Sequence, residues 1–153
     1  SRCAAWQRGP KPKRSARRPD EIVTAVIVPI VDGWQGFAKV GTRNAMVIAV
    51  CNAALVVDRP AASVTVAMGS VGPTIVRAPE DSADVQDKID WDSMRLVGDA
   101  DEVDDVVREF GARCSAAARP IDDHRSTADY RRHAVGVLGA RLLRRAFVGA
   151  AAA

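Results

Sequence analysis

The residues best suited to chemistry in this chain are two histidines, and their surroundings argue against a catalytic centre. His124 follows Asp122 and Asp123, so these three side chains could form a small acidic metal site or could instead cap and solvate the start of a helix. His133 lies next to two arginines, which is typical of a surface or interface histidine. The sequence has no GxGxxG, GxxxxGK(S/T), GxSxG or HExxH motif. We therefore expect no catalytic residue and no resident metal.

The cysteines, Cys3, Cys51 and Cys114, are odd in number and widely spaced, with no CxxC pair. This pattern predicts neither a disulfide framework nor a zinc site, and it fits a reducing cytoplasm best. Cys51 falls in an apolar strand pattern and Cys114 on an apolar helical stripe, so we expect both to be small core residues.

The composition fits one globular domain with a basic end. The 153 residues are 48% hydrophobic and 27% charged, with a net charge of +3. Residues 1–19 hold seven basic residues and no acid, which leaves 15 basic and 19 acidic residues, a net charge of −4, for the rest. Such an arm could bind nucleic acid by releasing counterions. This arm contains three prolines and precedes no recognisable nucleic-acid-binding module, so we expect no nucleic-acid partner. We expect a poorly ordered segment over 1–19 and a folded domain over 20–153.

No apolar run reaches the roughly 18 residues that a membrane span requires, and the basic residues near the N-terminus precede no apolar signal core. We expect a cytoplasmic protein without a membrane span.

The first half of the chain has the pattern of strands. Residues 21–29 (EIVTAVIVP) are rich in β-branched and apolar side chains at odd-numbered and even-numbered positions alike. This pattern predicts a strand that is covered on both faces. A short strand is expected within 31–40. The apolar run in 44–58 and the alternating residues 63–68 predict an antiparallel hairpin. Glycines and a proline at 69–73 should end the sheet.

The second half has helical periodicity. Residues 80–89 form a weak acidic helix candidate, and a stronger helix should begin near Asp99 with one apolar stripe: Val103, Val106, Val107, Phe110 and Cys114. The last helix should have Ser126 or Thr127 as its N-cap and run through Phe147. The fold class is therefore α+β, with a small antiparallel sheet of three to four strands packed on one side by about three helices.

Three stretches carry a more specific signal. The first joins RPDEIVTAVIVPI (18–30) to GFAKVGTRNAMVIAV (36–50), the second is MGSVGPTIVRAPE (68–80), and the third is PIDDHRSTADYRRHAVGVLGARLLRRAF (120–147). In this order they resemble the C-terminal domain of the FAD-binding (medium) subunit of molybdenum hydroxylases, the carbon monoxide dehydrogenase and xanthine dehydrogenase family. The glycine-rich loops that hold the FAD pyrophosphate in that family are absent from this chain.

The resemblance implies a cofactor and partners. FAD would be shared with an N-terminal half that this chain lacks, and molybdopterin and 2Fe–2S clusters would lie on a molybdenum-containing large subunit and an iron–sulfur small subunit. The resemblance implies that Lys39, in the Phe37-Ala38-Lys39 segment, lies next to the flavin. Arg43 is a second candidate for flavin contact, and it could instead brace the loop by ion pairing. Tyr130, Arg131 and Arg132 fit helix-start packing and a domain interface.

Two hypotheses about function follow. The first is a portion of an oxidoreductase flavoprotein that passes electrons from the molybdenum and iron–sulfur centres to flavin, inactive as an isolated chain because the FAD-binding half is missing. The alternative is a truncated remnant or interaction module that keeps the fold and binds no flavin.

Overall fold

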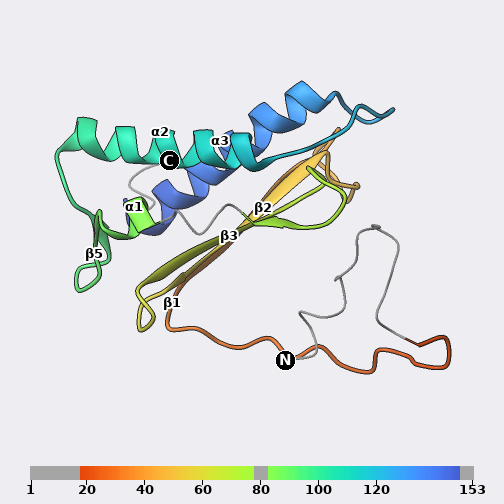
Figure 1. The fold of residues 1–153 in the computed structure, drawn as a ribbon, viewed down its shortest axis with the longest axis horizontal. Coiled ribbons are helices and arrows are strands. Elements are labelled where there is room, and N and C mark those ends of the chain that lie inside the picture. The colour runs from red at the N-terminus through yellow and green to blue at the C-terminus, as the bar shows by residue number, and fades with distance from the viewer. Residues whose placement is uncertain (1–17, 78–82, 149–153) are drawn as a thin grey trace. The chain divides into compact units, whose positions relative to one another are not determined.

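Residues 18–77 and 83–148 are described by a computed structural model, which falls into two units, residues up to Ile30 and residues from Val31 onward. The second unit contains a four-stranded antiparallel sheet in the order β1-β2-β3-β4, a small hairpin and two long helices (Figure 1). The strands are β1 (Gly33–Val40), β2 (Cys51–Asp58), β3 (Ser63–Gly69), β4 (Val76–Arg77), β5 (Ile89–Asp90) and β6 (Arg95–Leu96). The helices are α1 (Ala83–Gln86), α2 (Ala100–Ala117) and α3 (Ala128–Phe147). The predicted α+β class is confirmed.

The central hairpin forms because its side chains alternate between two environments. On β2 every second residue, from Cys51 to Val57, is fully buried, and β3 buries Val64, Val66 and Met68. Helix α3 packs against β1 and β2 on this face, and α2 packs against α3 (Figure 1). The sheet therefore has one helix-covered face and one open face.

Both long helices begin where the sequence predicts. Asp99 caps α2, accepting the Glu102 N–H at 2.9 Å while the Glu102 carboxylate accepts the Asp99 N–H at 2.9 Å. Thr127 caps α3 by accepting the Tyr130 N–H at 3.2 Å. The stripe on α2 is buried at Val107, Phe110 and Cys114, and these side chains join one core with Leu138 and Leu142 of α3.

Glycines set the close contact between α2 and α3. A Cβ added at Gly111 would lie 2.8 Å from the Gly136 carbonyl oxygen, and one added at Gly139 would lie 2.7 Å from the Cys114 Sγ. The Ser115 hydroxyl also donates to the Arg132 carbonyl at 2.7 Å across this contact. The two helices are thus already as close as their backbones allow.

Three expectations for secondary structure need correction. Residues 21–29 do not form a strand: among the described residues, no backbone hydrogen bond involves 22–31, and a strand exists only when a neighbour pairs with it. The sheet does not end at 69–73, because the chain turns through Ser70, which has a φ of 61°, and returns as β4 beside β3. The helix expected over 80–89 shortens to α1, and Ile89 joins a hairpin strand instead.

Most of the poorly ordered arm expected over 1–19, namely residues 1–17, lies outside the described residues. Within the part that the structure describes, no helix combines the length and apolar character needed to cross a bilayer.

Candidate functional site

Strand β1 carries the predicted site, and its alternate side chains face opposite sides of the sheet. Trp34, Ala38 and Val40 pack against the core, whereas Phe37 and Lys39 project from the open face. Phe37 is 63% exposed. An aromatic ring and a cation thus stand two residues apart on a surface that no described helix covers.

The Lys39 ammonium is held by the loop that follows β1. Its Nζ donates to the Val47 carbonyl at 3.0 Å, and the Val50 N–H donates to the Val40 carbonyl at 2.7 Å to close the loop. This hydrogen bond was not predicted from the sequence, and the Lys39 side chain is exposed rather than tied into the core. Because an ammonium has three N–H donors, the Val47 bond leaves two for a ligand.

Arg43 lies in the same loop but does not join Lys39 by a described contact. The Ala45 N–H donates to the Arg43 carbonyl at 2.9 Å, which makes a tight turn at this point. In the described part of the chain the Arg43 side chain forms no ion pair, so the predicted bracing role is not seen. The turn instead depends on backbone geometry.

The strand register adds a residue that the sequence reasoning missed. Phe37 pairs with Ala54, Ala54 with Ala67, and Ala67 with Arg77 of β4, so all four side chains share the open face. With strands about 4.8 Å apart, Phe37 and Arg77 lie about 14 Å apart across the sheet. The signal was present in the Pro-Thr-x-x-Arg run, but only the register brings that arginine to the same face.

The loop beside Lys39 also exposes apolar side chains. Met46 is fully exposed and Ile48 is 72% exposed, and they flank the Val47 residue whose carbonyl binds Lys39. Together with Phe37 they place apolar surface next to a cation. Such a combination suits a ligand that is both planar and anionic.

The histidines and cysteines that the sequence singled out do not form a second site among the described residues. No group of three or more His, Cys, Asp or Glu side chains within the described ranges is arranged to hold a metal ion, and His124 and His133 are exposed. Cys51 and Cys114 are fully buried, which confirms their core assignment. Burial raises the pKa of the Cys114 thiol to about 12 and also raises the pKa of Cys51, an effect that the charge of Arg131 partly offsets. Both are therefore neutral thiols.

Arg131 is a structural link rather than an interface anchor. Its guanidinium is almost completely buried, donates to the Ser70 carbonyl at 3.1 Å and pairs with the Asp123 carboxylate at 2.5 Å. The N–H of Arg125, the side chain of Arg131 and the N–H of Ser126 donate to Asp123 and lower its pKa to about 2. This cluster joins the loop before α3 to the end of β3.

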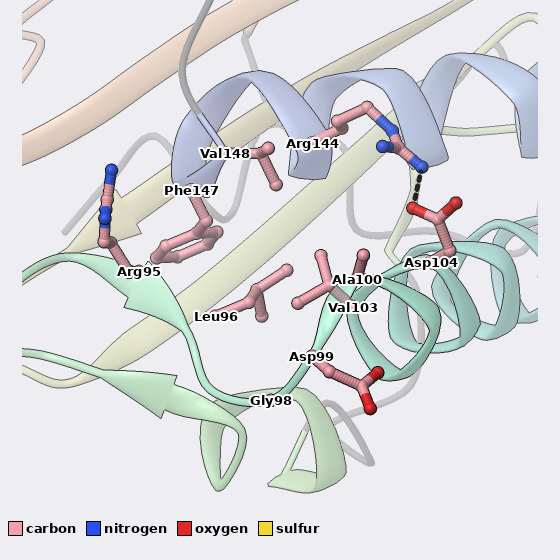
Figure 2. A pocket seen from close by; sticks show the side chains of 10 residues that line it. All are labelled: Arg95, Leu96, Gly98, Asp99, Ala100, Val103, Asp104, Arg144, Phe147 and Val148. Atoms are coloured by element: carbon pink, nitrogen blue, oxygen red, sulfur yellow. Dashed lines mark hydrogen bonds and ion pairs between the residues drawn. The ribbon is translucent and has the colours of Figure 1, made fainter. Parts of the chain in front are cut away.

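A cavity of about 340 Å³ lies between β6, the start of α2 and the end of α3 (Figure 2). Leu96, Val103 and Phe147 line it with apolar surface, and an ion pair between Arg144 and Asp104, 2.6 Å long, stands at its edge. The capping box already satisfies N–H groups at the start of α2, so the helix end offers little to an anion. Neither Lys39 nor Arg43 lines this cavity.

An antiparallel sheet with helices on one face and an open, partly apolar face that carries Lys39 defines a small α+β domain. The family model for the CO dehydrogenase flavoprotein C-terminal domain matches residues 37–146. The chain belongs to this family.

Solved structures agree with this assignment. Reconstituted CO dehydrogenase from Oligotropha carboxidovorans is 26% identical with a TM-score of 0.60, over 87% of this chain and 44% of that chain. A cyanide-inactivated form of Cu,Mo-CO dehydrogenase is 27% identical with a TM-score of 0.59 over the same shares. CO dehydrogenase from Hydrogenophaga pseudoflava, in a form that lacks the Mo-pyranopterin moiety of its molybdenum cofactor, is similar in fold, with 23% identity and a TM-score of 0.54 over 78% of this chain and 39% of that chain.

A comparison with curated protein sequences finds no match. The chain spans less than half the length of the solved chains that it matches.

Proposed function

We propose that this chain is the C-terminal portion of a flavoprotein subunit in a molybdenum-dependent dehydrogenase, where it covers one side of FAD held mainly by an N-terminal half. The family membership supports this function, and the observation that carries it is the open sheet face with Lys39 and Phe37. Bound flavin would accept electrons from iron–sulfur and molybdenum centres on partner subunits.

The side chains on this face suit a flavin in their chemistry. Phe37, Met46 and Ile48 offer apolar surface to a planar ring, and Lys39 keeps two N–H donors for an anionic group. A cation near the flavin stabilises its anionic reduced form more than its neutral oxidised form. Lys39 would therefore raise the flavin reduction potential, and Arg43 is the second candidate for contact.

The test is co-expression with the N-terminal half of the flavoprotein from the genome that encodes this chain. The complex should carry FAD, and Lys39→Met should weaken FAD binding or lower the two-electron reduction potential by roughly 20–65 mV, as expected for a charge worth about 1–3 kcal/mol at this range. Lys88→Met is the matched control, because Lys88 is exposed on the turn before β5, outside strands β1 to β4 and the 41–50 loop.

Unchanged potential and FAD affinity in Lys39→Met would remove Lys39 from the site. A complex without any FAD would instead support the alternative, an interaction module that retains the fold and binds no flavin. A genomic setting without genes for the molybdenum and iron–sulfur subunits would count against the assembly.

A further inference from the structure

The segment before β1 exposes apolar side chains on both of its faces. Between 58% and 98% of the surface of six residues is exposed: Ile22, Val23, Val26, Ile27, Val28 and Ile30. These residues occupy odd and even positions alike, so turning the segment over would not bury them. A continuous apolar run of this kind marks a surface that another body covers.

The backbone of the same segment is equally unpaired. Within the described ranges, residues 22–31 make no hydrogen bond, whereas the residues just before them form a closed turn. In that turn the Arg18 N–H donates to the Glu21 carboxylate at 2.8 Å and the Glu21 N–H donates to the Arg18 carbonyl at 3.1 Å. Residues 22–28 all retain an N–H donor, and Pro29, which has none, closes the run.

The exposed side chains and the unpaired backbone both call for the same kind of partner, a sheet that is covered on both faces. A strand with apolar residues on both faces belongs inside a sheet that is covered on both sides. The edge of an existing sheet can supply the backbone partners, and its flanking layers can supply the apolar cover. A single helix would cover one face only and would leave the N–H groups unpaired.

The comparisons show that the matched proteins have a large part beyond the region that this chain covers. The structural match covers 87% of this chain, more residues than positions 33–153 contain, so the likeness to CO dehydrogenase includes part of the segment that precedes β1. More than half of the matched CO dehydrogenase chain lies outside the match. The matched flavoprotein therefore has a large further part to which such a sheet can belong.

We propose that residues 22–28 form a β-strand by pairing with the edge of a sheet in the N-terminal half of the flavoprotein, and so tie that half to this domain. This inference rests on the proposed function, because that function supplies the partner. The segment then acts as a docking strand, which is unpaired in the isolated chain and ordered on assembly.

The experiment uses the full chain, alone and co-expressed with the N-terminal half from the same genome. Amide hydrogen exchange of residues 22–28 should be fast in the isolated chain and at least 100-fold slower in the complex. Val26→Pro and Ile27→Pro each delete one N–H, and neighbouring N–H groups point to opposite edges of a strand, so at least one variant should weaken association tenfold or more. The matched controls, Val26→Ala and Ile27→Ala, keep the N–H and should weaken association less.

Folding does not confound this test. The segment makes no described hydrogen bond in the isolated chain, so all four variants should melt at the temperature of the parent. Residues 22–28 that exchange in the complex as fast as in the isolated chain would overturn the proposal. It would also be overturned by a self-associated isolated chain with a protected segment, by protection in the isolated monomer, or by no association with the N-terminal half.

The proposal and the flavin function can fail separately. A colourless complex in which residues 22–28 are protected would refute flavin binding and leave the docking strand in place. A flavin-containing complex with an unprotected segment would refute the docking strand alone. If the two halves do not associate, a single fused chain still tests flavin binding by its absorbance.

Discussion

Replacing Phe110 by alanine tests the packing of α2 on the core. The Phe110 side chain is 2% exposed, and its ring lies 3.7 Å from the position that a Cβ on Gly139 would occupy. Removing a buried phenylalanine side chain costs about 3–5 kcal/mol, with the larger values at sites that cannot relax into the cavity.

The geometry of the helix pair places Phe110→Ala toward the upper end of that range. Gly111 already contacts the Gly136 carbonyl at a distance that leaves no room for a Cβ, so α2 cannot move closer to α3 and fill the space. For a domain of this size the loss corresponds to a fall in melting temperature of roughly 10–20 °C.

Thermal and urea unfolding of the full chain, followed by circular dichroism, measure the effect. Val97→Ala is the surface control, because Val97 is 55% exposed and its truncation should change stability by no more than about 0.5 kcal/mol. If Phe110→Ala melts within a degree or two of the parent, the α2 stripe is not buried and the packing described for α2 and α3 is wrong.

Three further predictions concern the same unit. Gly111→Ala should lower the urea midpoint, with a loss of about 1–3 kcal/mol, because its Cβ meets the Gly136 backbone; an unchanged midpoint would contradict the close contact. Asp123 has a lowered pKa, so its contribution to stability is complete above about pH 4 and is lost as the pH falls toward about 2. Urea midpoints across this range should fall more steeply for the parent than for Asp123→Asn, and parallel curves would refute the linkage. Iodoacetamide at pH 8 should leave Cys51 and Cys114 unmodified in the folded chain and label both in guanidinium, as mass spectrometry of their peptides can show.

Local features of this fold were predictable from the sequence because they depend on neighbours in the chain. Asp99 and Thr127 cap helices through side chains that reach N–H groups three residues away, and such spacing is visible in the sequence. The β2–β3 hairpin was predictable for a similar reason, since alternation of apolar residues reports which face is buried.

Features that depend on distant partners were not predictable in the same way. Arg131 bonds to Ser70, 61 residues away, and nothing in the Tyr-Arg-Arg motif distinguishes this buried guanidinium from the half-buried Arg132 beside it. Strand β4 has only two residues and becomes a strand because β3 offers an edge. The apolar pattern of 21–29 correctly signals a need for cover, but it carries no information about which polypeptide supplies it.

The candidate site likewise combines features that the sequence predicts with features that depend on distant partners. The sequence singled out Lys39 through its resemblance to a family, yet the bond from its ammonium to the Val47 carbonyl and the alignment of Arg77 with Phe37 arise from loop closure and strand register. The core uses the covered face of the sheet, and the described cavity lies at β6 and the ends of α2 and α3. In the proposed function, a flavin held by another part of the protein would meet apolar surface beside the Lys39 cation at the open face and the 41–50 loop. For this reason the proposed function assigns the cofactor to a second body rather than to the interior of this domain.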